Sequence, residues 1–165
     1  MLIDTLRKLL VFVTFVLTQA LLFSHIHLFG CATILLYVYF VVMFPRNYPK
    51  WAILIWSFAL GLCVDMFSNT PGMAAASLTL VGCVQPYLLE LFIPREATEN
   101  MRPTMSELGV SKFLVFASVL VFLHCLLFFT LEFFSFFNWQ QWALNVVGSS
   151  VLTLVFLVAL ETIRK

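Results

Sequence analysis

The sequence predicts an all-α integral membrane protein, a bundle of six transmembrane helices in one domain. Hydrophobic residues make up 62% of the 165 residues and charged residues only 10%, whereas a soluble domain is about half apolar and a quarter charged. The nine Lys and Arg residues fall in four short clusters separated by long apolar stretches. Each stretch has room for two spans of about 17–20 residues and a turn.

The basic clusters also predict the orientation of the chain. They are Arg7 and Lys8; Arg46 and Lys50; Arg95, Arg102 and Lys112; and Arg164 and Lys165. Because basic residues concentrate on the cytoplasmic side of a membrane, we expect both termini and every second connection to be cytoplasmic. A five-helix bundle is the main alternative because the second apolar run is short, but an odd count would place the later basic clusters outside.

The helices are predicted at about residues 6–28, 31–44, 51–67, 71–92, 112–131 and 142–163. Asp4 can cap the first helix. This segment resembles a signal peptide, but its apolar run continues beyond the weak cleavage site at residues 18–20, so we expect a retained helix. Pro45 and Pro49 separate the second helix from the third.

Turn and cap residues delimit the remaining helices. Thr70 suits an N-cap and Pro71 a first helical position, so the fourth helix is expected to start near Pro71, with a kink at Pro86. Residues 93–111 carry charges of both signs and are expected to form a cytoplasmic loop or a short surface helix. The fifth helix is rich in Phe, and the Trp residues at the start of the sixth suit the outer interface.

The segment from Gly61 to Gly72 holds the densest group of candidate functional residues: Gly61, Asp65, Ser68, Pro71 and Gly72. Gly61 and Asp65 are four residues apart and therefore share one helix face. A carboxylate at membrane depth is costly, at roughly 3 kcal/mol at the helix centre. Asp65 either fixes the turn, with the free N–H groups at the start of the fourth helix as its nearest partner, or contacts another protein or a substrate.

Small and polar residues predict where helices pack together. They are Ala75, Thr79 and Gly82 in the fourth helix, and Asn145, Gly148 and Ser149 in the sixth. Small residues allow close approach of helix backbones in lipid. We expect packing within the bundle to be their role, with contact to a partner helix as the alternative.

No pattern of residues indicates catalysis or a cofactor. The four cysteines form no CxxC pair, which favours a packing role over a metal site or a disulfide framework. No nucleophile–base constellation or paired carboxylates can be assembled. The net charge of +1 gives no reason to expect nucleic acid as a partner.

The Gly61–Gly72 segment, the small-residue helix after it and the size of the chain together resemble the rod shape-determining protein MreD family. The chain departs from that pattern in its high Phe content and its short second helix. The resemblance implies a fold similar to the substrate-binding subunits of energy-coupling-factor transporters. It also implies a non-enzymatic scaffold of the bacterial inner membrane that binds MreC and is indirectly linked to MreB, to RodA and to its transpeptidase.

A vitamin-type substrate-binding subunit of a membrane transporter is the alternative function. It would need a ligand pocket near the outer face, for which His25, Asp65 and Trp139 are the candidates.

Overall fold

The computed structural model describes residues 2–19, 35–93, 101–132 and 139–164 of the chain. These residues form helices and no strand. The helices are α1 (Leu2–Thr18), α2 (Val38–Val42), α3 (Lys50–Ser68), α4 (Met73–Phe92), α5 (Met105–Leu108), α6 (Val110–Glu132) and α7 (Trp139–Arg164).

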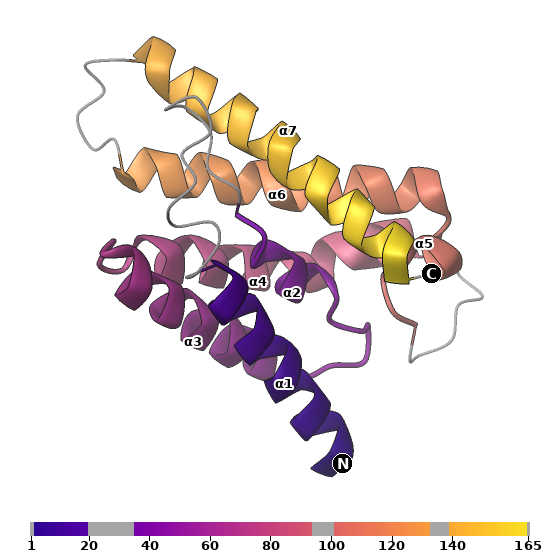
Figure 1. Ribbon diagram of the computed structural model, residues 1–165. Helices are drawn as coiled ribbons and strands as arrows, with labels where there is room; N and C mark the ends of the chain where they lie inside the picture. Colours follow the sequence, from indigo (N-terminus) through magenta and orange to yellow (C-terminus); the bar gives the residue numbers. More distant parts are fainter. Residues whose placement is uncertain (1, 20–34, 94–100, 133–138, 165) are drawn as a thin grey trace.

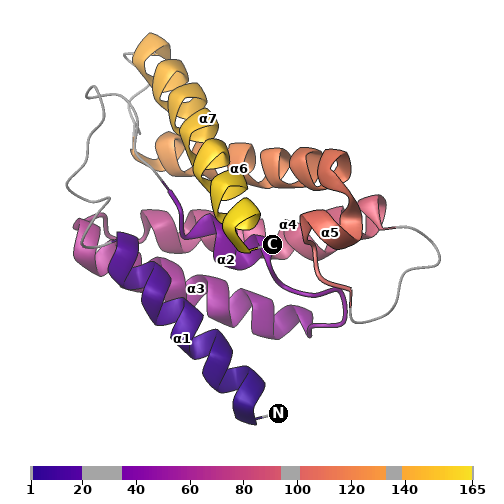
Figure 2. The same cartoon turned by 45° about the vertical axis from the view of Figure 1, so that its right-hand side comes forward.

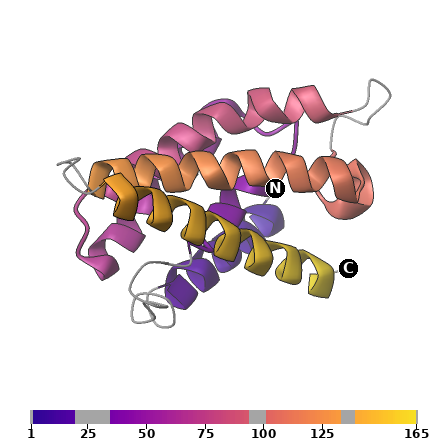
Figure 3. The same cartoon turned by 90° about the horizontal axis from the view of Figure 1, so that it is seen from above.

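Two helical hairpins form the body of the molecule (Figure 1). The first pairs α3 with α4 and the second pairs α6 with α7, and α4 packs on α6 to join them. The short α2 contacts both α4 and α6, and it lies between the two hairpins in the turned view as well (Figure 2). α1 packs against α2 and α3, and from above α7 runs obliquely to α6 (Figure 3).

Four of the described helices are long and apolar enough to cross a membrane. They are Lys50–Ser68, Met73–Phe92, Val110–Glu132 and Trp139–Ile163. The apolar part of α1 in the described residues, Leu9–Thr18, is shorter, and the rest of the helix expected to reach residue 28 lies outside them. An all-helical protein with membrane-length apolar helices is therefore shown, and the count of six remains a prediction.

The second predicted helix differs most from the structure. A helix was expected over residues 31–44, but within residues 35–44 only Val38–Val42 are helical. All five residues of α2 are buried. This segment is apolar on every side and too short to span a bilayer, which takes about 20 residues. Pro45 follows directly, and the segment is buried between the hairpins instead of facing lipid.

The region after residue 100 is more ordered than a solvated loop. It contains the short helix α5, and Met101, Pro103 and Leu108 are buried. The backbone N–H of Arg46 donates to the carbonyl oxygen of Met101 at 3.1 Å. This connection therefore packs against the end of the bundle through its apolar residues.

Candidate functional site

The candidate site is the end of the α3–α4 hairpin that carries the connecting turn, where the two helices approach very closely. A Cβ atom at Gly61 would lie 2.4 Å from the Cα atom of Ala75 and 2.8 Å from the carbonyl oxygen of Ala74. Further along, a Cβ atom at Gly82 would lie 2.6 Å from Oγ of Ser57. Only glycine fits at these two crossing points without moving backbone or side chain. Ala75 and Gly82, which were expected to be packing residues, and Gly61, which was expected at the turn or at a partner contact, all lie where α3 and α4 pack together.

Asp65 lies at this crossing and is 5% exposed. Its Oδ1 atom accepts hydrogen bonds from Oγ1 of Thr70 at 2.8 Å and from the backbone N–H of Ala74 at 2.9 Å. Its Oδ2 atom accepts from the backbone N–H of Ala75 at 2.9 Å. Two of these three hydrogen bonds come from the start of α4, which the sequence indicates as the nearest partner of this carboxylate.

The Asp65 carboxylate therefore caps α4 from the preceding helix. The first N–H groups of a helix have no partner inside the helix and carry partial positive charge, so an anion is stabilised there. The N-cap residue of α4 is Gly72, which has no side chain to serve as a cap. Asp65 supplies that missing acceptor and satisfies its own charge without a basic residue.

The turn between the helices depends on two residues with positive φ. Asn69 has φ 56° and ends α3, with its backbone N–H donating to the carbonyl oxygen of Asp65. Gly72 has φ 82°, and a Cβ atom there would meet nothing within 4 Å, so the backbone conformation alone favours glycine.

The predicted start of the fourth helix at Pro71 is wrong by two residues. A residue with φ 82° cannot belong to a right-handed helix, so α4 begins after Gly72, at Met73. The Thr70 hydroxyl does not cap α4, because it donates to Asp65 instead. Pro71 and Gly72 are exposed at the tip of the turn, and Ser68 is half-buried.

The remaining candidate residues are buried or half-buried on α4 and α7. Thr79 donates its hydroxyl to the carbonyl oxygen of Ala75 at 2.6 Å within α4. Asn145 and Ser149 of α7 are buried, and Gly148 is half-buried. The polar stripe of α7 therefore faces protein, as the sequence predicts.

A set of side-chain hydrogen bonds around α2 was not foreseen from the sequence. Thr153 accepts from the backbone N–H of Leu35 at 3.2 Å, and Nε2 of Gln85 donates to the carbonyl oxygen of Phe44 at 3.2 Å. Nε2 of His124 and the Tyr37 hydroxyl share a hydrogen bond of 2.9 Å.

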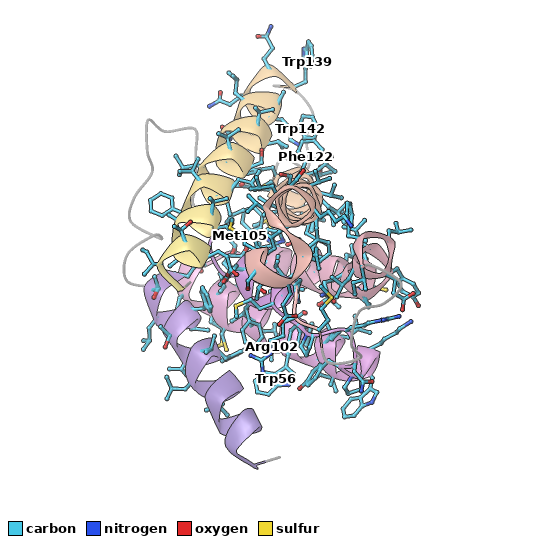
Figure 4. The ribbon with its side chains drawn as sticks, turned by 90° about the vertical axis from the view of Figure 1, so that its right-hand side faces the viewer. Trp56, Arg102, Met105, Phe122, Trp139 and Trp142 are labelled. Carbon is cyan, nitrogen blue, oxygen red and sulfur yellow. The ribbon has the colours of Figure 1, made fainter. Side chains whose placement is uncertain are left out.

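At the end near α5, Glu161 of α7 accepts from the Tyr39 hydroxyl and, at 3.3 Å, from the backbone N–H of Met105. Met105 lies between α6 and α7 in the view onto this end (Figure 4). Side chains of α4, α6 and α7 thus satisfy backbone and side-chain polar groups of the α2 segment. Non-helical backbone at membrane depth is tolerated only when buried and partnered in this way.

The residues suggested for a ligand pocket were Asp65, Trp139 and His25. Asp65 directs both carboxylate oxygens to α4 and Thr70, Trp139 is 68% exposed, and His25 lies outside the described residues. Among the residues that the structure places, no three His, Cys, Asp or Glu side chains are grouped to hold a metal ion. In this geometry the Asp65 site positions helices.

Comparison with known proteins identifies no matching family model, curated protein or solved structure.

Proposed function

We propose that the protein is a non-enzymatic scaffold of the bacterial cell-elongation machinery in the inner membrane. In this proposal it binds an MreC-like membrane protein and through it helps couple MreB to peptidoglycan synthesis by RodA and its transpeptidase. The resemblance of the Gly61–Gly72 segment to the MreD family motivates the assignment. Its two termini would be cytoplasmic, as the basic clusters predict.

The observation that carries the proposal is the fixed geometry of the α3–α4 turn. Asp65 holds the start of α4, and the close contact at Gly61 leaves no room for the helices to shift. A rigid turn with a satisfied carboxylate suits a surface that presents neighbouring residues to a partner. It does not offer a free group for proton transfer or nucleophilic attack.

The turn has apolar neighbours that a membrane helix could cover. Met66 is 83% exposed and Phe67 is 61% exposed at the end of α3. Pro71 is exposed at the tip. We assign these three side chains to contact with the membrane helix of the MreC-like partner, with Asp65 acting behind them as a positioning residue.

Co-purification in mild detergent tests the proposal. The tagged chain and its MreC-like neighbour are expressed together, and we expect the partner to be retained through affinity and size-exclusion steps. A Met66→Asp/Pro71→Asp variant should lose the partner, while Leu91→Asp, an equally exposed position at the other end of α4, should keep it. Absence of association by the parent chain, with both proteins folded, would overturn the proposal.

A small-molecule-binding transporter subunit is the second candidate. The observation that favours it is a set of buried polar atoms without hydrogen-bond partners on α6 and α7: Nδ1 of His124, Nε1 of Trp142 and Oδ1 of Asn145. Buried polar groups normally have partners, and a bound molecule can supply them. Native mass spectrometry of the purified protein would show a retained small molecule if this candidate is right, and protein without one if it is wrong.

A further inference from the structure

Basic side chains and exposed aromatic rings meet where α3 begins and α4 ends. Lys50 is the first residue of α3, and its Nζ atom lies 4.2 Å from the centre of the Tyr87 ring of α4. Tyr87 is 58% exposed and Trp51, next to Lys50, is 67% exposed. Arg46 is exposed four residues before Lys50. The hairpin therefore carries two cations and two amphipathic rings at one rim.

The loop before α3, which carries Arg46, is held in place. The ring of Tyr48 stacks on Phe44 with 5.0 Å between centroids, and the backbone N–H of Tyr48 donates to the carbonyl oxygen of Pro45 at 3.1 Å. The bond from the N–H of Arg46 to Met101 attaches the loop to the connection that precedes α5. Arg46 thus lies on a fixed turn that leads into Lys50 and α3.

Among the described residues, Arg46 and Lys50 are the cations of this rim. In the part of the chain that the structure describes, no ion pair involves Arg46 or Lys50. Two described carboxylates have to be considered with these cations. Glu107 of α5 accepts a hydrogen bond from the backbone N–H of Arg102 at 2.7 Å, and Glu90 of α4 is exposed one turn beyond Tyr87. Arg46 and Lys50 remain as the positive part of the rim.

Apolar side chains continue from the rim along the exposed faces of both helices. Ile55 and Phe58 follow Trp51 on α3, and Leu80 and Val84 precede Tyr87 on α4; all four are exposed. Tyr and Trp prefer the headgroup level of a bilayer, and basic side chains reach to its charged surface. The order of charge, aromatic ring and apolar surface matches the order of headgroup, glycerol and acyl chain in a phospholipid.

We propose that the rim formed by Arg46, Lys50, Trp51 and Tyr87 binds the headgroup of an anionic phospholipid, whose acyl chains lie along the exposed faces of α3 and α4. The phosphate and the anionic headgroup contact Arg46 and Lys50. Tyr87 holds the Lys50 ammonium by a cation–π contact, and so reduces the freedom that Lys50 loses on binding. This proposal is independent of the partner proposed above.

Native mass spectrometry with defined lipids tests the site. The full chain in a neutral detergent is mixed with equal amounts of phosphatidylglycerol and phosphatidylcholine with the same acyl chains. We expect preferential binding of phosphatidylglycerol. Each basic side chain near an anionic surface contributes roughly fivefold, so Arg46→Gln/Lys50→Gln should lower the apparent affinity for phosphatidylglycerol by about 25-fold at most, with phosphatidylcholine binding unchanged.

Three comparisons make the test decisive. Lys112→Gln removes an exposed cation from α6 and should leave the preference intact, and Lys50→Arg should keep it because the charge remains. Soluble glycerol phosphate in excess should not displace the lipid, because it lacks acyl chains. Equal binding of the two lipids by the parent chain would overturn the proposal. So would an equal loss in Lys112→Gln, which would indicate diffuse attraction to the whole charged end, or displacement by glycerol phosphate.

Discussion

Removing the Asp65 carboxylate should destabilise the α3–α4 hairpin more than any other single loss of charge in the described chain. Asp65→Ala leaves the N–H groups of Ala74 and Ala75 buried without an acceptor. An unsatisfied buried donor costs about 1–3 kcal/mol, so the two groups together cost about 2–6 kcal/mol. Since the variant no longer buries a carboxylate, part of that cost is recovered. We expect a net loss of about 2–4 kcal/mol in the free energy of unfolding.

Asp65→Asn removes the negative charge but keeps one hydrogen-bond acceptor, so it measures the contribution of the charge separately. The amide oxygen can still accept from Thr70 or Ala74, but the NH2 group then faces the N–H of Ala75, where two donors meet. The negative charge next to the helix N-terminus is also lost, which is worth up to about 2 kcal/mol in a partly buried site. The expected loss is about 1–2 kcal/mol, smaller than for Asp65→Ala.

Unfolding in mixed micelles with a rising fraction of SDS, followed by circular dichroism, measures these losses. Glu90→Gln is the matched control, because Glu90 is an exposed carboxylate on α4. A surface change of this kind should stay within about 0.5 kcal/mol of the parent. A change of stability within the same 0.5 kcal/mol for Asp65→Ala would show that Asp65 does not cap α4.

Three further predictions follow from the packing and from the proposed function. Gly61→Ala should lower the free energy of unfolding by about 1–3 kcal/mol or more, because its Cβ atom would overlap Ala75. Gly72→Ala should lower it by about 1–2 kcal/mol, because alanine is strained at this positive φ. If Gly72→Ala were the more destabilising of the two in the same unfolding assay, the result would contradict the close packing at Gly61. Tyr37→Phe should cost about 1–3 kcal/mol because it removes the partner of buried His124, and a stability equal to the parent would show that the hydrogen bond contributes nothing. If the scaffold proposal holds, Asp65→Ala should weaken rod-shape maintenance in cells; normal rods at normal protein levels would show that the residue is dispensable.

The α3–α4 hairpin was the part of the fold most open to prediction from sequence. The apolar run, the basic residue at one end and the turn residues at the other gave α3 to within one residue at each end. The spacing of Gly61 and Asp65 indicated that they share one helix face. In the structure both residues contact α4, Gly61 by close approach and Asp65 by hydrogen bonds. These features depend on residues close together in the sequence, so they can be predicted from the sequence alone.

The start of α4 was misplaced because two capping rules competed. Thr70 and Pro71 match the usual N-cap and first-turn preferences, but Gly72 adopts positive φ and the carboxylate of Asp65 takes over as cap. A cap supplied from seven or more residues upstream has no short sequence signature.

The buried α2 segment could not be derived from local pattern. Val38–Val42 are apolar on all sides, so the pattern fits a membrane helix and a buried segment equally well. Whether this segment spans the membrane or is buried depends on residues distant in the sequence. Those that form hydrogen bonds with this region are Thr153, His124, Glu161 and Gln85. Polar residues inside predicted transmembrane helices were the available signal, because such residues need partners within the protein.

The most direct test of the scaffold proposal is site-specific photo-crosslinking in cells. A photoreactive amino acid replaces Met66, which is 83% exposed at the end of α3 next to the turn, or Leu91, which is 79% exposed at the opposite end of α4. Our account predicts a crosslink to the MreC-like protein from position 66 and none from position 91. Equal crosslinking from both positions, or none from position 66 while both proteins are folded and present, would contradict it.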